Sequence, residues 1–395
     1  MIQSTMSPYY AYVAFALLCT SYACYYNYCS RRRNDLVRLT SLDDIEHLLS
    51  PPVSLTAQLQ SRALANARLK PAFGIDSTFV NGDLAAHGAF TRFAINLISP
   101  RNLPWSRLAD IAKGTVTVQL CDRGSIPFDT LVRRLVMYVI LVGLLEEYVD
   151  ESAIAVDDID LVTGGINELW ALSKTSTYRP DLLEEVNMRL RCWLPNMTNP
   201  MEIIIPTYET MWRVVAVATA LGHDNTQAIP LFSALLQQPT TERYRQCTDD
   251  SFSADAFMQE VLRLYPPTRR ISRVVPVTTS SILSRFCPRL FTRYITFAAD
   301  VEALQCDSLW ANSRREFDPS RHHLQRSTEQ QRKTLLAFGT GKLTCVAKNW
   351  APQAAAIMVA AILDQVGAEK DFALEPGKAI GGREGWEGWF VQRRL

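Results

Sequence analysis

The sequence has few residues of the kind that build metal centres, and it has almost no excess charge. Its five histidines show no metal-binding spacing, and the adjacent His322 and His323 would point in different directions on a regular element. The nine cysteines are scattered, odd in number and without a CxxC pair. This pattern argues against a zinc site and against a secreted disulfide framework. The net charge of +1 gives no reason to expect a nucleic-acid partner.

Long apolar stretches are also scarce, and only one of them is suited to a membrane. Residues 8–29 carry no charge and are followed by Arg31, Arg32 and Arg33. A helix of about 20 such residues spans a bilayer, and flanking arginines stay on the cytoplasmic side. The alternative, a cleaved signal peptide, carries its positive charge before the apolar run. We therefore expect a single-pass anchor over 8–29 in the endoplasmic reticulum membrane, with the rest of the chain in the cytosol.

The remainder shows no internal repeat, low-complexity segment or linker. Helical apolar spacing dominates it, and strand-like pieces are few. The predicted helices cover 41–50, 55–67, 83–98, 128–149, 155–175, 179–193, 207–221, 228–238, 252–265, 297–304 and 346–366. The predicted strands cover 115–120, 272–278 and 388–392. The sequence thus predicts one catalytic domain over 35–395, mainly α with small β-sheets.

A charged pair lies inside an apolar helical pattern near residue 260. Glu260 and Arg263 are three residues apart, so a helix places them on one face, within reach of each other. Exposed pairs of this kind contribute little, but the apolar neighbours here require part of the helix to be buried. A buried pair needs further partners. Arg321, in the charged loop at 315–323, is a candidate third member because guanidinium groups can share one carboxylate.

The stretch "LLAFGTGKLTCVAKNW", residues 335–350, places a cysteine between a glycine-containing loop and an expected helix. Gly339 and Gly341 indicate a tight turn before Cys345. One interpretation is an inert buried thiol, since free cysteine is among the most buried residue types. The other is a thiolate held on the loop to bind a metal. The residues around Cys345 alone leave both open.

These motifs together indicate a family. Their order is ExxR, then FxPxR, then FGxGxxxC, which resembles the cytochrome P-450 haem-thiolate monooxygenases, and in particular their filamentous-fungal branch. The resemblance runs from about residue 83 to the C-terminus. The matching residues are Glu260 and Arg263, then Phe317, Pro319 and Arg321, then Phe338, Gly339, Gly341 and Cys345.

The resemblance implies a haem b cofactor with Cys345 as the axial thiolate ligand of the iron. Gly339 and Gly341 would let the backbone pass close to the sulfur, and Phe338 would pack against the haem. The dipole of a helix starting near residue 346 would lower the pKa of the thiol. The resemblance also implies cations for the haem propionates, and the candidates are Arg273, His87 and Arg92.

On the other side of the haem the family carries an acid and a threonine that deliver protons. Glu209 and Thr210 are the favoured pair, because they lie in an apolar helical pattern with Pro206 at a bend. Asp224 and Thr226 compete, but they follow a predicted helix end and suit an N-cap. The C-terminal "GREGWEGWF" and the loop at 72–80 resemble segments that line the substrate pocket. The candidate aromatic lining is Trp386, Trp389 and Phe390.

The chain departs from the family pattern at several positions. Leu343 stands where a cation is usual, and Ala347 stands where a glycine is usual. Pro352 falls inside the helix predicted after Cys345, where proline costs about 3 kcal/mol.

The resemblance implies a monooxygenase that hydroxylates or epoxidises a small apolar metabolite, expected to be a terpenoid or polyketide intermediate. Electrons would come from NADPH through a cytochrome reductase docking near Cys345, where Lys333, Lys342 and Lys348 make the surface basic. A monomer is expected. Two alternatives stay open: a haem-dependent isomerase, cyclase or dehydratase, and a haem-free member of the fold.

Overall fold

The computed structural model describes residues 12–22, 36–121, 123–247, 252–278, 292–310, 313–323, 325–367 and 370–394. Residues 12–22 form an exposed helix. Within this described part of the chain, no helix is both long and apolar enough to cross a bilayer. The anchor expected over 8–29 therefore has no support from the structure, and the rest of that stretch lies outside the described residues.

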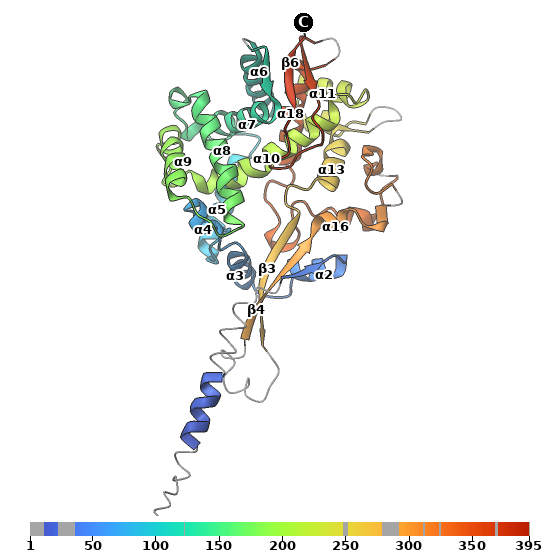
Figure 1. The fold of residues 1–395 in the computed structure, drawn as a ribbon. Coiled ribbons are helices and arrows are strands. Elements are labelled where there is room, and N and C mark those ends of the chain that lie inside the picture. The colour runs from blue at the N-terminus through green and yellow to red at the C-terminus, as the bar shows by residue number, and fades with distance from the viewer. Residues whose placement is uncertain are drawn as a thin grey trace, which may run out of the picture.

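Helices make up most of the fold (Figure 1). The α-helices are α2 (Leu42–Leu49), α3 (Leu55–Ala65), α4 (Leu69–Phe73), α5 (Leu84–Leu97), α6 (Trp105–Cys121), α7 (Phe128–Tyr138), α8 (Val156–Ser173), α9 (Pro180–Trp193), α10 (Met201–Gly222), α11 (Ala228–Gln237), α12 (Thr241–Arg245), α13 (Ala254–Leu264), α16 (Val301–Gln305), α17 (Glu329–Lys333) and α18 (Ala351–Gln365). A π-helix, η1 (Val139–Leu144), continues α7. The short 3-10 helices are η2 (Glu146–Tyr148), η3 (Glu151–Ala153), η4 (Ser308–Trp310), η5 (Pro319–His322) and η6 (Gly341–Leu343).

The strands form two small sheets of three strands each. In the first sheet β4 (Thr292–Asp300) lies between β1 (Leu36–Leu39) and β3 (Arg270–Thr278); β1 is parallel to β4 and β3 is antiparallel. In the second sheet β6 (Phe390–Arg393) lies between β2 (Ser125–Pro127) and β5 (Phe372–Glu375), and both pairings are antiparallel. The predicted combination of a mainly helical fold with small sheets is confirmed.

The long helix α10 runs through the middle of the helical part (Figure 1). It packs against α7, α13 and α18, and nearly every side chain after Tyr208 is buried. Alanines on α18 let the backbones approach closely, and Ala354, Ala355 and Ala356 are fully buried. The sequence predicts this helix from residue 207, directly after the bend expected at Pro206. The helix instead begins at Met201 and continues through Pro206.

Helix α6 replaces the strand predicted over 115–120. The alternating β-branched residues Thr115 to Val118 suggested a strand, but β propensity is weak when tertiary packing opposes it. Leu108, Ala112, Val116 and Leu120 are all buried, and their spacing of four residues marks one helix face. This face packs against α18. The predicted helix over 297–304 was also partly wrong, because β4 continues to Asp300 before α16 begins.

The helix after the cysteine begins later than predicted. Residues 346–350 form turns, and α18 starts at Ala351. Pro352 consequently lies in the first turn of α18, where its missing N–H has no intrahelical partner to lose. The expected cost of about 3 kcal/mol for a proline in the helix interior therefore does not apply.

Candidate functional site

The loop before Cys345 requires glycine at two positions. Gly339 and Gly341 have φ values of 68° and 72°, a region that favours glycine. A Cβ atom on Gly341 would also lie 2.8 Å from the Oγ of Ser50, at the end of α2. The loop is closed by the amide N–H of Cys345, which donates to the carbonyl of Phe338 at 3.0 Å. These constraints fix the backbone that carries the cysteine.

Solvent reaches Cys345, although enough protein surrounds its sulfur to change its acidity. Burial raises the pKa of the Cys345 thiol, and the backbone N–H of Ala347 offsets only part of this effect. The expectation that a helix N-terminus lowers this pKa is wrong, because α18 starts six residues after the cysteine. Without a metal, the thiol is therefore mostly protonated at neutral pH.

The aromatic residue before the glycine turn, Phe338, is half-buried and packs against the main hydrophobic core. Leu343, which replaces the usual cation, ends η6 and is half-buried. Ala347 is half-buried in the turns that precede α18. A hydrophobic residue and a small residue thus take the places of a charge and a glycine next to Cys345.

Two buried arginines lie on α3 and β3, two elements that pack against each other. Arg62 and Arg273 are 9% and 7% exposed. Arg273 donates to the carbonyl of Ser272 at 2.9 Å, and Arg62 donates to the carbonyl of Thr78 at 2.7 Å. Burial lowers the pKa of Arg273 to about 10. Burial and the charge of Arg273 lower the pKa of Arg62 to about 10.

His87 joins these arginines through Thr78, because its Nδ1 lies 2.9 Å from the Thr78 hydroxyl. Burial and the positive charge of Arg62 lower the pKa of His87. The structure thus brings together two of the predicted propionate contacts, Arg273 and His87. Arg92, on the same helix as His87, is exposed.

An anionic group with two carboxylates fits this cluster. In the described part of the chain, no carboxylate forms an ion pair with Arg62 or Arg273, although a buried charge is costly without one. The haem propionates are such carboxylates. Sequence analysis missed Arg62, since it lies in an ordinary helix far from the recognised motifs. Only its burial and its missing partner identify it.

The structure also brings together Glu260, Arg263 and Arg321. The Arg263 Nε and the Glu260 carboxylate lie 2.7 Å apart, and both side chains are fully buried. The Nε of Arg321 lies 3.6 Å from the same carboxylate. Burial would raise the pKa of Glu260, but hydrogen bonds from Arg263 and His322 lower it below its usual value. The carboxylate is therefore ionised and shared.

Sequence analysis missed His322 as a member of this cluster. Its Nε2 lies 2.8 Å from the Glu260 carboxylate, closer than Arg321. The backbone N–H of Asp318 also donates to Glu260 at 3.1 Å. Arg263 additionally lies 4.8 Å from the centre of the Trp310 ring. The cluster thus connects α13 to η4 and η5.

Glu209 is buried in α10 and is 2% exposed. Its carboxylate forms ion pairs with Arg383, from the C-terminal segment, and with Arg213 at 2.9 Å. Arg213 also donates to the carbonyl of Pro267 at 2.9 Å. Glu209 therefore joins α10 to the segment after α13 and to the C-terminal turn. Thr210, the next residue, is half-buried.

Further cations surround this ion pair. Arg383 and Arg68 lie 4.9 Å and 5.6 Å from the centre of the Trp170 ring. Burial and the charge of Arg383 lower the pKa of Arg68. Burial, Arg383 and Arg68 lower the pKa of Lys174 as well. Four cationic side chains, Arg68, Lys174, Arg213 and Arg383, thus lie around the Glu209 carboxylate or its ion-pair partners.

The competing pair lies between two helices, as its cap-like sequence suggested. Helix α10 ends at Gly222, and α11 begins at Ala228. Asn225 accepts hydrogen bonds from the backbone N–H groups of Gln227 and Ala228, so it caps α11. Asp224 and Thr226 flank this cap.

The aromatic residues of the C-terminal segment pack onto the core. Trp386 and Trp389 are 5% and 4% exposed, and both rings contact Phe128 at centroid distances of 5.5 and 5.9 Å. Phe390 is exposed. The two tryptophans, predicted as pocket lining, thus belong to the packed core around Phe128.

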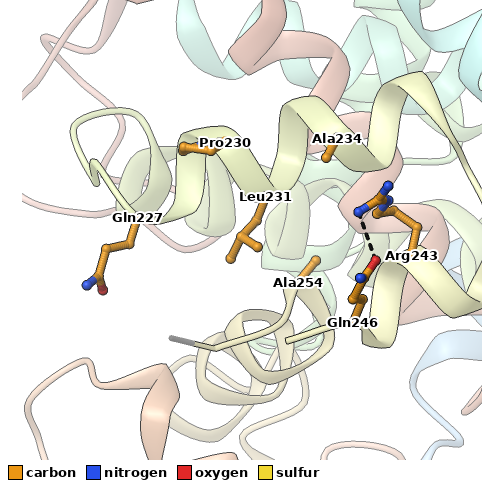
Figure 2. A pocket seen from close by; sticks show the side chains of 7 residues that line it. All are labelled: Gln227, Pro230, Leu231, Ala234, Arg243, Gln246 and Ala254. Atoms are coloured by element: carbon orange, nitrogen blue, oxygen red, sulfur yellow. Dashed lines mark hydrogen bonds between the residues drawn. The ribbon is translucent and has the colours of Figure 1, made fainter. Parts of the chain in front are cut away.

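A pocket of about 230 Å³ lies between α11, α12 and the start of α13 (Figure 2). Arg243 and Gln246 close one end of it through a hydrogen bond of 2.8 Å, and Leu231 and Pro230 form an apolar side. None of the residues that sequence analysis singled out lines this pocket.

No family model and no curated protein matches the sequence. Solved structures do match. A six-coordinated cytochrome P450 from Thermus thermophilus aligns with a TM-score of 0.58 and 14% identity, covering 91% of this chain and 92% of that one. CYP164A2 of Mycobacterium smegmatis, in its ligand-free state, gives 0.54 and 17%, covering 90% of each chain. The haem domain of cytochrome P450DA gives 0.58 and 13%, covering 92% and 88%.

Proposed function

We propose that this chain, which has the cytochrome P450 fold, is a haem-thiolate monooxygenase with Cys345 as the iron ligand. The observation that carries the proposal is that the chain has both a cysteine on a glycine-fixed loop and two buried arginines that lack a carboxylate partner among the described residues. A thiolate ligand and two propionate sites are what haem b requires from a protein.

Haem with a thiolate ligand supplies electron density that favours cleavage of the O–O bond of dioxygen. The residues of the chain hold and orient this group. Cys345 must lose its proton to bind iron, and the loop between Phe338 and Cys345 keeps its sulfur in place. Arg62 and Arg273 would bind the propionates, and His87 would assist them through Thr78.

Thr210 is the residue that we propose for proton delivery. It directly follows the ion-paired Glu209 on α10. A hydroxyl can both donate and accept a hydrogen bond, so that of Thr210 could pass protons without itself being charged. Glu209, held by Arg213 and Arg383, is proposed as the acidic partner of Thr210. Arg92 is proposed as a weaker, exposed contact of the cofactor.

The electron donor is proposed to be an NADPH-dependent reductase. Lys342 and Lys348 are exposed on either side of Cys345, whereas Lys333 pairs with Glu329 at 3.0 Å. This surface suits an acidic partner, and its association should weaken with salt. The substrate is proposed to be a small apolar molecule.

The carbon-monoxide difference spectrum of the reduced protein tests the ligand. Wild-type protein should give the red-shifted band of a thiolate complex, and Cys345→Ser should lose it. Cys192→Ser, at an exposed cysteine on α9, is the matched control and should keep the band. A thiolate band that persists in Cys345→Ser would contradict the assignment.

Turnover tests whether the reaction is oxidative. Thr210→Ala should retain haem but convert more NADPH to peroxide or water, with product formation slowed by about 10²-fold or more. Turnover that needs neither NADPH nor dioxygen would instead indicate a haem-dependent isomerase or cyclase.

A further inference from the structure

A second pocket lies next to Arg62, because Thr78, which accepts a hydrogen bond from Arg62, lines it. In contrast to the surroundings of Arg62 and Arg273, this pocket is acidic and aromatic. Its volume is about 470 Å³, within the range of small-molecule sites. The loop at 76–78, one side of α5 and the start of α10 form its walls. Among the residues that the structure describes, neither lysine, arginine nor histidine lines it.

Two polar side chains of this pocket, Ser77 and Glu202, have hydrogen-bonding capacity that the described residues do not use. Ser77 is only 6% exposed, and its hydroxyl forms no hydrogen bond with the described residues. Glu202 has no cation within ion-pairing distance in the same part of the chain; its carboxylate accepts one hydrogen bond, from the backbone N–H of Asp76 at 3.0 Å. This bond fixes one oxygen and leaves the other free to accept.

Asp76 also lines the pocket, but its charge is already compensated. Its carboxylate lies 2.7 Å from the ammonium group of Lys70, and both side chains are exposed. Glu202 is thus the lining carboxylate whose charge is not paired.

The remaining wall is largely aromatic. Phe90 and Phe93 come from α5, and Tyr148 packs edge-on against Phe93 at a centroid distance of 5.8 Å. Ile203 and Met197 complete the apolar surface. Aromatic faces attract cations as well as apolar groups, so this wall tolerates a positive charge next to it.

We propose that this pocket binds a small molecule with an aromatic or apolar body and a protonated amine. The ammonium group would donate to the Glu202 carboxylate and to the hydroxyl oxygen of Ser77. The body would lie against Phe90, Phe93 and Tyr148. Binding at this site does not require haem, so the proposal can be tested independently of the proposed function.

The test compares two probes of equal shape, 4-phenylbutylamine and 4-phenylbutan-1-ol, by titration calorimetry of the purified full chain. Only the amine carries a charge at pH 7. We expect it to bind more tightly than the alcohol, and Glu202→Gln should weaken amine binding about ten- to hundredfold because a charged hydrogen bond is lost. Binding of the alcohol should not change.

Glu184→Gln is the matched control, since Glu184 forms an exposed ion pair with Arg191 on α9 and does not line the pocket. Ser77→Ala should weaken both probes. The absorption spectrum is recorded in parallel, because an amine that binds iron shifts the haem band and is insensitive to Glu202→Gln. Equal affinities for the two probes, or unchanged amine binding in Glu202→Gln, would overturn the proposal.

Discussion

The thiol of Cys345 determines how the site responds to pH. Because burial raises its pKa above the ordinary value of 9.0, the thiolate fraction is small at neutral pH and grows only as the pH rises past 9. Alkylation of Cys345 by iodoacetamide in haem-free protein should therefore be slow at pH 7 and accelerate above pH 9. Peptide mass spectrometry separates Cys345 from the other cysteines, such as Cys192.

The same pKa predicts the sign of the coupling to cofactor binding. Iron binding displaces the thiol proton, so haem uptake should release a proton and become tighter as the pH rises from 6 to 9. Rapid alkylation at pH 6 would show that the thiol is already ionised and would contradict this sign.

Arg273 should favour haem binding while it lowers the stability of the haem-free protein. In the haem-free protein its charge is buried without a carboxylate from the described residues, so Arg273→Gln should not destabilise the fold and is expected to stabilise it by about 1–3 kcal/mol. The same variant should retain less haem. Urea unfolding of the haem-free protein and haem content after purification measure the two effects. Arg270→Gln, at an exposed neighbour on β3, is the control. A loss of stability without a loss of haem would assign Arg273 a structural role only.

The residues that could be predicted from the sequence are those that belong to short motifs. Arg321 lies far along the chain from Glu260 and Arg263, yet each is part of a pattern with its own spacing, and the structure brings them together. Arg62 and His322 could not be found this way. Their roles depend on burial and on which charge they face, and neither is encoded in neighbouring residues.

At the scale of elements, the cluster around Glu260 connects α13 to the segment that carries η4 and η5. Glu260→Ala would leave Arg263, Arg321 and His322 buried without their carboxylate, which should cost about 3–5 kcal/mol. Thermal unfolding and haem content measure the loss. Glu184→Ala removes an exposed pair and should change stability by less than about 1 kcal/mol. Equal effects of the two variants would mean that the cluster contributes no more than a surface pair.

Two prolines, Pro352 and Pro206, lie in helices at positions where proline destabilises the helix to different degrees. Pro352→Ala should change stability by less than about 1 kcal/mol, because the first turn of α18 has no hydrogen bond for this N–H to make. Pro206→Ala, inside α10, should restore one helix hydrogen bond and stabilise the protein more than Pro352→Ala does. Chemical denaturation of both variants compares them. A larger gain from Pro352→Ala would place the helix start nearer to Cys345.

The elements themselves were predicted well where apolar periodicity is strong, as for α5, α8 and α9. They were not predicted where local preference and packing disagree. The β-branched run from Thr115 to Val118 favours a strand. The helical conformation is stabilised instead, because it buries Val116 and Leu120 on the face of α6 that packs against α18. The start of α18 was misplaced because the turns at 346–350 have the composition of a helix.

At the scale of the whole molecule, the cofactor should act as a stabilising ligand. A group that binds only the folded state stabilises it by about 2.7 kcal/mol at a hundred times its dissociation constant. Addition of haemin to haem-free protein should therefore raise the melting temperature, and Cys345→Ala and Arg273→Gln should each reduce that rise. Differential scanning fluorimetry measures it. An unchanged melting temperature would favour the haem-free alternative.

The whole fold could be inferred from three motifs because they occur together in one order, although no sequence comparison detects a relative. The anchor expected over 8–29 lacked this kind of support. It rested on composition alone, and the helix described over 12–22 is not long and apolar enough to span a bilayer.

The pairing of β1 with β4 has a consequence for how the chain folds. Leu36 lies opposite Thr296, and in the second sheet Ser125 lies opposite Gln392, so each sheet joins positions that are far apart in sequence. Contacts of such long range form slowly, because the loop between them must close first. During synthesis, β1 cannot pair with β4 until residues near 300 have left the ribosome. The helices can form locally in the meantime, and their exposed apolar faces make this interval the period of greatest risk of aggregation.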